Sequence, residues 1–526
     1  MKKSTSLVTA AIASLALSTV SLGAGAAARS VDLLISGGTV FTGSDAPFIG
    51  DVAITGDRIV AVAPHLALRA TRTIDARGMV VAPGFIDPHT HMGDDLASAD
   101  PAKRLIPMFL MQGVTTAFTG NDGGGAIDVG AVLASARAKP VGINYATYTG
   151  FGTIRSAVIG EDKRDPTPAE LARMEGLVAS AMCEGALGLS TGLFYAPQSF
   201  SKTPEVVALS RVAAAHDGYY DSHIRDESSY TVGLMAAIDE EIAIAREAHI
   251  PAHVSHIKAL GVDVQGKAGE VIAHIDAARA QGLDITASQY PWNASGTSLV
   301  ASLIPLWAQD GGRAALLKRF DDPSLATRLR ADITEDMRRR GGADKLLIVE
   351  GPYRNKTLGA VAKELGKGTV DAAIAAIRVG DAGVVSFNMS EADIGAFMRQ
   401  PWTMTDSDAS PGHPRVYGSF ARKYDKYVKQ DRVITLRQFI ERSTALPADW
   451  FHLAGRGHLK SGSFADVVVF DPKTYAARAT YEQPTLFAQG VRTVLVNGKV
   501  AVDGGKLTGS AAGRALPHVP RPGSCR

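Results

Sequence analysis

Between residues 80 and 450 the chain alternates apolar strand candidates with helical stretches, and this alternation limits the folds it can adopt. Strands that alternate with helices form a parallel sheet, and about eight such units over this length predict a (β/α)8 barrel. A doubly wound sheet is the competing fold, but no G-x-G-x-x-G motif opens a helix after the first strand. The expected helices are 168–182, 204–216, 231–248 and 268–281, and the expected strands are 80–87, 114–119, 141–145, 185–189, 219–222, 252–255, 284–288 and 402–405. A further strand candidate, 384–387, has no clear place in this alternation.

The two ends of the chain share a different sequence pattern, which predicts short strands joined by turns. Short strand candidates broken by Gly-Gly and Gly-Asp turn signals fill residues 31–80, and similar pieces return after residue 465. We therefore expect residues 29–80 and 455–515 to form one small β-sandwich domain and residues 81–454 to form the barrel. The charged, helix-forming stretch at about 292–342 is expected to be a helical insert over the barrel.

The first residues predict export. Two lysines, an apolar stretch from Leu7 to about Leu22 and a run of small residues up to Ala28 have the three parts of a secretory signal, so residues 1–28 are expected to be cleaved. A soluble periplasmic or secreted protein follows. A net charge of +2 and the lack of a long basic tract indicate no nucleic-acid partner, and no later run is long enough to span a membrane. The two cysteines, Cys183 and Cys525, are expected to be free; the oligomeric state cannot be predicted.

The strand at 80–87 runs directly into His89 and His91. Alternate strand residues point to the same side, so these two imidazoles can converge on one point. Two neutral imidazoles at the end of a buried strand suit a transition metal such as zinc, whereas a solvated pair in a loop is the alternative.

Other polar residues also follow expected strands, where a barrel places its active site. His223, His256 and Asp408 end three later strands, and Asp122 lies in the turn after the second. Such a set supports one or two zinc-like ions, which lower the pKa of a bound water toward ~7 and polarise a carbonyl. A carboxylate must then carry the proton from water to the leaving nitrogen, and Asp408 is the candidate general base.

Several motifs resemble those of the amidohydrolase superfamily. They are the Asp32–Gly38 segment, the Gly84–His91 segment and the Gly462–Phe470 segment. Within that superfamily, four motifs are similar to those of the D-aminoacylase (N-acyl-D-amino-acid deacylase) family: 185–197, 222–227, 254–258 and 412–420. The resemblance spans nearly the whole chain after the expected signal. It implies a β domain built from both termini, a metal-carrying barrel and an inserted lid.

The resemblance also implies roles for individual residues. The metal ligands would be His89, His91, His223, His256 and Asp408, and Asp408 would also be the general base. The substrate carboxylate would meet Lys258 and Arg415, with Tyr195 and Tyr290 nearby. An arginine fork binds a carboxylate with two parallel hydrogen bonds, which independently favours Arg415.

One position departs from the family pattern. The family's turn after the second strand usually reads Gly-Asn-Cys-Gly, with the cysteine as a metal ligand, whereas this chain has Asp122 there. A carboxylate can ligate or bridge metals but is a harder ligand than a thiolate. Asp122 is therefore predicted to be a ligand, with ordinary turn chemistry as the alternative.

The remaining histidines have less specific interpretations. His413 could stabilise the tetrahedral oxyanion or could be structural. His253 is expected to support the strand or the ligands rather than bind metal. The other seven are expected to be solvated: His65, His216, His249, His274, His452, His458 and His518.

The predicted function is zinc-dependent hydrolysis of the small-molecule N-acyl-D-amino acids to a carboxylate and a free D-amino acid. The enzymatic alternatives are a cyclic-amide (hydantoin-type) ring opener and a dipeptidase-like amide hydrolase. Lys258 and Arg415 favour a substrate with a free α-carboxylate over a cyclic one. A non-catalytic binding protein that kept the barrel is the third alternative.

Overall fold

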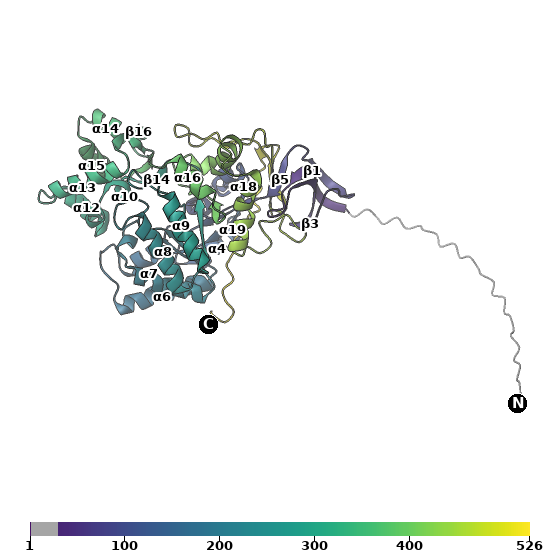
Figure 1. Cartoon of the computed structure of the whole chain (residues 1–526), viewed down its shortest axis with the longest axis horizontal. Coiled ribbons are helices and arrows are strands. Elements are labelled where there is room, and N and C mark those ends of the chain that lie inside the picture. Colours follow the sequence, from purple (N-terminus) through teal and green to yellow (C-terminus); the bar gives the residue numbers. More distant parts are fainter. Residues whose placement is uncertain (2–29, 526) are drawn as a thin grey trace.

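The computed structural model describes residue 1 and residues 30–525 of the chain (Figure 1). Apart from Met1, the expected signal segment lies outside the described residues. Among the described residues, no helix has both the length and the apolar character needed to cross a membrane. The sheet built from the chain ends lies at one side of the molecule, and helices α10 and α12–α15 form a separate lobe at the other.

Both ends of the chain contribute to a single nine-stranded sheet. Its order is β22-β21-β20-β19-β5-β1-β2-β3, with β4 paired to β1. Strand β5 joins the two ends because Val81 pairs with Val40 on one side and with Val469 on the other. The expected sandwich is thus hydrogen-bonded as one sheet, whose strands are β1 (Ser30–Val40), β2 (Phe48–Thr55), β3 (Arg58–Ala63), β4 (Arg69–Asp75), β5 (Val80–Pro83), β19 (Val467–Phe470), β20 (Val491–Val496), β21 (Lys499–Asp503) and β22 (Lys506–Leu507).

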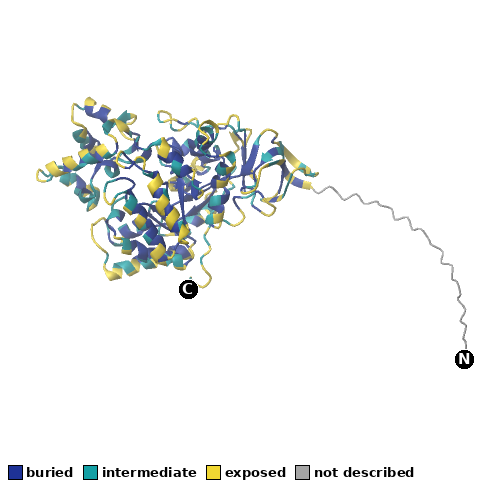
Figure 2. Ribbon diagram, viewed as in Figure 1, coloured by how far each residue is buried: buried dark blue, intermediate teal, exposed yellow. Residues whose placement is uncertain are grey.

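The middle of the chain forms two parallel sheets. One has the order β6-β7-β8 and the other the order β18-β13-β12-β11-β10-β9. Every residue of these strands is buried, as expected of parallel strands covered on both faces (Figure 2). The strands are β6 (Phe85–Asp87), β7 (Val114–Thr119), β8 (Asn144–Thr147), β9 (Thr149–Gly150), β10 (Gly188–Gly192), β11 (Tyr219–His223), β12 (Ala252–Val254), β13 (Ile285–Gln289) and β18 (Thr403–Thr405).

Helices that follow these strands pack their apolar faces against them. Helix α6 begins with a capping box, in which Thr167 and Glu170 each bond the other's backbone N–H, and with Pro168 in its first turn. Val178, Val206, Ile238 and Ile275 of four successive helices belong to one core. These four helices are α6 (Pro168–Cys183), α7 (Thr203–Ala215), α8 (Leu234–Ala248) and α9 (Ala268–Ala280). The same layer also contains α4 (Val129–Ala138), α5 (Phe151–Val158), α16 (Glu391–Met398), α17 (Arg415–Arg422), α18 (Leu436–Ser443) and α19 (Ala445–Trp450). Three short helices follow β6: α1 (Gly93–Ala97), α2 (Pro101–Arg104) and α3 (Pro107–Leu110).

The insert is larger than the sequence predicts and is not purely helical. It has its own core, which includes Leu303, Ile333 and Ile377, and its own antiparallel sheet in the order β14-β17-β15-β16. The candidate strand at 384–387 is β17, which pairs with β14 and returns the chain toward the parallel sheets. The expected end at residue 342 is therefore wrong, because β15, β16 and β17 complete the antiparallel sheet that β14 begins. The elements are β14 (Ser295–Ser298), α10 (Leu299–Leu303), α11 (Leu306–Gln309), α12 (Gly312–Phe320), α13 (Ala326–Arg339), β15 (Leu346–Ile348), β16 (Lys356–Thr357), α14 (Leu358–Glu364), α15 (Thr369–Val379) and β17 (Gly383–Ser386).

The C-terminal tail folds back and ends in a disulfide bond. Cys525 is bonded to Cys183 at the end of α6, so the expectation of two free cysteines is wrong. Ala515 forms a bridge with Tyr145 of β8, and Arg521 forms an ion pair with Asp217. His216 is buried beneath this tail rather than solvated as expected.

Candidate metal centre and substrate cleft

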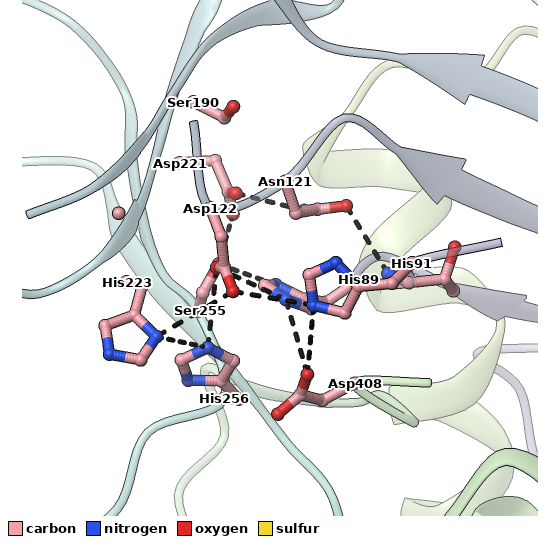
Figure 3. A network of polar contacts seen from close by, with 12 residues as sticks. His89, His91, Asn121, Asp122, Ser190, Asp221, His223, Ser255, His256 and Asp408 are labelled. Carbon is pink, nitrogen blue, oxygen red and sulfur yellow. Dashed lines mark hydrogen bonds and ion pairs between the residues drawn. The ribbon is translucent and has the colours of Figure 1, made fainter. Parts of the chain in front are cut away.

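Six predicted metal ligands from five strand ends meet at one place (Figure 3). His89 and His91 follow β6, Asp122 follows β7, His223 ends β11, His256 follows β12 and Asp408 follows β18. Parallel strands present their carboxyl ends at the same edge, so residues far apart in sequence meet there. The structure thus brings the four histidines and two aspartates together, and their role as metal ligands stays a prediction.

Asp122 lies at the centre of this group. Its Oδ1 is 3.4 Å from Nε2 of His89 and 3.5 Å from Nε2 of His256. Its Oδ2 is 3.4 Å from Nε2 of His91 and 3.8 Å from Nδ1 of His223. Burial alone would raise the pKa of Asp122, but the surrounding imidazoles hold it well below its usual value. Asp122 is therefore an anion that faces two pairs of imidazoles, one with each oxygen.

Asp408 approaches the same imidazoles and also contacts a guanidinium. Its Oδ1 is 3.2 Å from Nε2 of His91, and its Oδ2 is 2.7 Å from Nη1 of Arg415. Its φ of 44° is in the left-handed region, a strained backbone conformation typical of functional sites. Burial would raise the pKa of Asp408, but Arg415 and the imidazoles hold it far below its usual value, so this carboxylate is ionised.

The donor set fits a divalent metal. Three groups, each of three side chains, place their ligand atoms within 4.8 Å of one another: His89, His91 and Asp122; Asp122, His223 and His256; and His89, His256 and Asp408. Nε2 of His89 and Oδ1 of Asp122 are buried without a hydrogen-bond partner, a costly state that a bound cation would relieve. Burial lowers the pKa of His89 and of His223 to about 4, so these two imidazoles are neutral. Against the effect of burial, Asp122 and Asp408 raise the pKa of His91 to about 9, and Asp408, Asp122 and Glu227 raise that of His256 to about 10, so a bound metal would displace a proton from each of these two rings.

Three further side chains orient the ligands. Nδ1 of His89 lies 2.9 Å from Oγ of Ser255, which donates to Asp221 at 2.6 Å. Asn121 donates to the other oxygen of Asp221 at 3.0 Å. Contacts of this kind fix the ring of a ligating histidine. No local pattern in the sequence indicates these roles, although all three residues lie at the same strand ends as the proposed ligands.

Glu227 is a fourth residue whose role the sequence did not reveal. Its carboxylate is bonded to Nζ of Lys258, and its Oε1 is 3.2 Å from Nδ1 of His256. The charge of Lys258 is thus already paired inside the site, although Lys258 does face the cleft as expected. Its binding of a substrate carboxylate stays a prediction. The sequence signals for Glu227 are its place four residues after His223 and its position at the end of the 222–227 motif.

Arg415 and Tyr290 line the cleft together, whereas His413 is held by the backbone. The guanidinium of Arg415 lies 4.8 Å from the ring centre of Tyr290, and its Nε has no hydrogen-bond partner among the described residues. Nδ1 of His413 accepts from the backbone N–H of Arg415, and its Nε2 lies 3.0 Å from the carbonyl of Ala294. Both ring nitrogens are occupied, which favours the structural interpretation of His413 over oxyanion stabilisation.

A cavity of about 380 Å³ opens above the six residues. The parallel sheets and the insert line it together, as Tyr195, Lys258 and Asp408 on one side and Thr297, Arg340 and Val384 on the other show. The ring of Tyr195 packs at a tilt against that of His223, with the ring centres 4.8 Å apart, and its hydroxyl accepts a hydrogen bond from Thr297 at 3.4 Å. His253 lies in β12 beside Thr286 and outside this lining, in agreement with its expected supporting role.

Known proteins resemble this chain over nearly its whole length. A model of the amidohydrolase family matches residues 72–502. The D-aminoacylase of Alcaligenes xylosoxydans xylosoxydans is 34% identical over 93% of this chain and 98% of its own length, and the N-acyl-D-glutamate deacylase of the same organism is 33% identical over 89% and 93%.

Solved structures agree. The N-acyl-D-glutamate deacylase from Bordetella bronchiseptica, complexed with zinc and a phosphonate inhibitor that mimics the tetrahedral intermediate, superposes with a TM-score of 0.78 at 32% identity and covers 93% of this chain and all of its own. A D-aminoacylase described for its binuclear metal centre gives 0.79 at 31% over the same shares. A D-hydantoinase, at 16% identity and a TM-score of 0.57, shares the fold alone.

Proposed function

This chain belongs to the amidohydrolase family, and we propose that it hydrolyses the amide bond of N-acyl-D-amino acids to give a carboxylate and a free D-amino acid. The observation that carries this proposal is the cluster of four histidines and two aspartates beneath a cleft that also holds Arg415. An amide needs an activated water and a protonated leaving nitrogen, and a carboxylate of an amino acid needs a cation to hold it. The cluster and Arg415 offer these functions side by side.

The two parallel sheets support a closed eight-stranded barrel. Only Tyr148 separates β8 from β9, so the β6-β7-β8 sheet continues into the second sheet along one chain segment. At the opposite edge Thr90 forms a parallel bridge with Ala409, and the backbone N–H of His91 donates to the carbonyl of Ala409. We infer that β6 and β18 close the ring at this point, which is also where the proposed ligands leave their strands.

We infer that His89, His91, Asp122, His223, His256 and Asp408 hold one or two zinc ions. Each oxygen of Asp122 faces a different pair of imidazoles, so Asp122 would contribute a negatively charged ligand to the site whether it held one ion or two. Bound zinc supplies Lewis acidity, which lowers the pKa of water toward ~7 and polarises the scissile carbonyl. The D-aminoacylase and the N-acyl-D-glutamate deacylase named above are described with a binuclear metal centre and with zinc, respectively.

The protein's own side chains carry the remaining steps. Arg415 binds the α-carboxylate of the substrate and holds the amide over the ligand cluster, with Tyr290 packed under its guanidinium. Asp408 accepts a proton from the attacking water and delivers it to the leaving nitrogen, so that an amine and not an amide anion departs. Tyr195 lines the cleft on the other side of the cluster, against His223, where it excludes water from the bound substrate.

The other candidate functions have less support. A cyclic amide carries no free carboxylate for Arg415, and the D-hydantoinase resembles this chain in fold alone. A binding protein without turnover has no need of an ionised Asp408 beside the ligand cluster.

We also propose that the protein is exported. Residues 1–28 have the composition of a secretory signal, and disulfides such as Cys183–Cys525 persist mainly in oxidising compartments. Cell fractionation with sequencing of the mature N-terminus tests this; a cytoplasmic protein that retains residue 1 would contradict it.

The activity is tested by release of free amino acid from N-acetyl-D-methionine and N-acetyl-L-methionine. Zinc-loaded protein is expected to hydrolyse the D form, and chelation is expected to abolish turnover. Hydantoin opening without hydrolysis of either linear substrate would favour the ring-opener alternative, and metal binding without any turnover would favour the binding protein.

A further inference from the structure

Arg340 is a buried cation that the proposed mechanism does not use. It directly follows α13 of the insert, is 1% exposed and lines the same cavity as the ligand cluster. Its Nε donates a hydrogen bond to the carbonyl of Ser302 at 3.2 Å, which satisfies one of the five N–H groups of the guanidinium. Its Nη1 is buried and has no hydrogen-bond partner among the described residues. A guanidinium buried in this state is costly unless a ligand completes it.

The other two cations of the cavity are paired. Lys258 is bonded to Glu227, and Arg415 is 2.7 Å from Asp408. The nearby Asp336 is bonded at 2.7 Å to Arg339 instead of Arg340. Within residues 30–525 no carboxylate lies within 4.0 Å of the guanidinium nitrogens of Arg340, so its charge, unlike those of Lys258 and Arg415, is not offset by a neighbouring carboxylate.

Tyr230 adds a second unpartnered donor at the same place. Its ring centre is 5.4 Å from the guanidinium carbon of Arg340, and its hydroxyl is buried without a hydrogen-bond partner in the described part of the chain. Tyr230 also lines the cavity. A guanidinium fork beside a phenol matches a carboxylate, whose oxygens accept several hydrogen bonds.

This pair lies on the other side of the cluster from Arg415. Tyr230 packs on Phe194 at 5.5 Å, and Phe194 packs on His223, whereas Arg415 contacts Asp408. A substrate held by its α-carboxylate at Arg415 can therefore direct a second group toward Arg340. Glu350 and Asp381 also line the cavity, but both are exposed and each accepts a backbone N–H, so water screens them at its mouth.

We propose that Arg340 and Tyr230 bind a second carboxylate of the substrate. The preferred substrates are then N-acyl-D-amino acids with two carboxylates, the second one carried by the amino-acid side chain or by the acyl group. This inference rests on the proposed function, since it assumes that Arg415 holds the α-carboxylate.

The test compares kcat/KM for matched substrates. N-acetyl-D-glutamate carries the second carboxylate in its side chain, N-succinyl-D-alanine carries it in its acyl group, and N-acetyl-D-glutamine and N-acetyl-D-alanine are the neutral references. A buried guanidinium that hydrogen-bonds a substrate carboxylate discriminates against a substrate that lacks this carboxylate. Wild-type protein is therefore expected to show a kcat/KM for one of the two diacids that is about 10-fold or more above that for its neutral reference. A preference for N-acetyl-D-glutamate would place the second carboxylate in the amino-acid side chain, and a preference for N-succinyl-D-alanine would place it in the acyl group.

Variants of Arg340 and of its neighbour Arg339 in α13 test whether Arg340 is responsible for the preference for a diacid. Arg340→Met is expected to lower kcat/KM for the preferred diacid by about 10- to 100-fold, mainly through KM, and to change the neutral reference by less than about 3-fold. Arg340→Lys, which keeps the charge, is expected to recover part of the preference. Arg339→Met is the matched control because its guanidinium faces the same tyrosine at 5.7 Å but is paired with Asp336, so it is expected to keep the preference.

The outcomes separate the two proposals. This inference would be overturned if wild-type protein hydrolysed the neutral references at least as fast as the diacids. It would also be overturned if Arg340→Met lowered kcat/KM equally for the diacid and its neutral reference and Arg340→Lys restored neither value. Either result would leave the proposed function intact. Failure of zinc-loaded wild-type protein to hydrolyse any of the four substrates would overturn both.

Discussion

At the scale of single residues, the site depends on two aspartates with different neighbours. Asp122 contacts only imidazoles among its charged partners, whereas Asp408 is shared between His91 and Arg415. The sequence could predict both, and the four histidines, because each follows an apolar strand. It could not predict Glu227 or Asp221 in their roles, since these depend on distances between neighbouring strands that no local pattern encodes.

Asp122→Asn tests the role of Asp122 as a ligand. The amide keeps the size of the side chain but loses the charge that faces four imidazoles, so zinc is expected to bind about 10- to 100-fold more weakly. Titration of the metal-free variant with zinc against a competing chelator measures this. Asp94→Asn, an exposed change in α1, is the control. Unchanged zinc affinity in Asp122→Asn would leave only the turn role for this residue.

Asp408→Asn tests proton transfer. Loss of a positioned general base is expected to lower kcat by about 10²- to 10⁴-fold. The bound zinc and the thermal unfolding midpoint are measured in parallel to separate chemistry from folding. A variant that keeps most of its kcat with full metal would show that another group carries the proton.

At the scale of elements, the insert contributes one wall of the cleft and is fastened to the parallel part of the molecule by polar contacts. The guanidinium of Arg338 in α13 is bonded to Asp263 at 2.7 and 2.8 Å, and Asp263 also accepts from Ser229. The strands and helices of the parallel sheets could be predicted because each has a local period. The end of the insert could not, because β17 is recognisable as part of it only through its pairing with β14, more than 80 residues earlier.

The contact at Asp263 predicts a pH dependence. Hydrogen bonds from Arg338 and then Ser229 lower the pKa of Asp263 from 3.8 to about 2 in the folded protein. The unfolded state thus binds this proton first as pH falls, so the contribution to stability is present above about pH 4 and is lost toward about pH 2. This exposed pair is expected to contribute at most about 1 kcal/mol.

Asp263→Asn measures that contribution. The free energies of unfolding in urea of wild type and variant are expected to differ near neutral pH and to converge as the pH falls below about 2, where Asp263 becomes protonated in the folded as well as the unfolded protein. Asp45→Asn, which changes an exposed carboxylate outside the insert, is the control. A difference that stays constant across this range would show that the charge of Asp263 is not what fastens the insert.

At the scale of the whole molecule, the two chain ends are tied to the middle in different ways. A β domain built from both ends could be predicted because strand signals return near the C-terminus, whereas its pairing as one nine-stranded sheet instead of a sandwich could not. The disulfide could not, because Cys183 and Cys525 are 342 residues apart and only the folded path of the tail brings them together.

Replacement of both cysteines by serine is expected to lower the free energy of unfolding by about 2–4 kcal/mol, since the cross-link restricts the unfolded chain. Turnover is expected to be unchanged, because Cys183 precedes β10 while the ligands follow the carboxyl ends of their strands. Denaturant unfolding and kcat/KM of the double variant test this, with the single Cys525→Ser variant in reducing buffer as the control. A double variant with wild-type stability would contradict the structural role of the bond.

The central claim is that six side chains from five strand ends hold the metal that drives hydrolysis. A crystal structure of the zinc-loaded protein with a phosphonate analogue of an N-acyl-D-amino acid, with anomalous data at the zinc edge, tests it most directly. We expect zinc at about 2.0–2.2 Å from histidine nitrogens and aspartate oxygens of the cluster, and the analogue's carboxylate on Arg415. Zinc bound elsewhere, with these six residues unligated, would contradict the account.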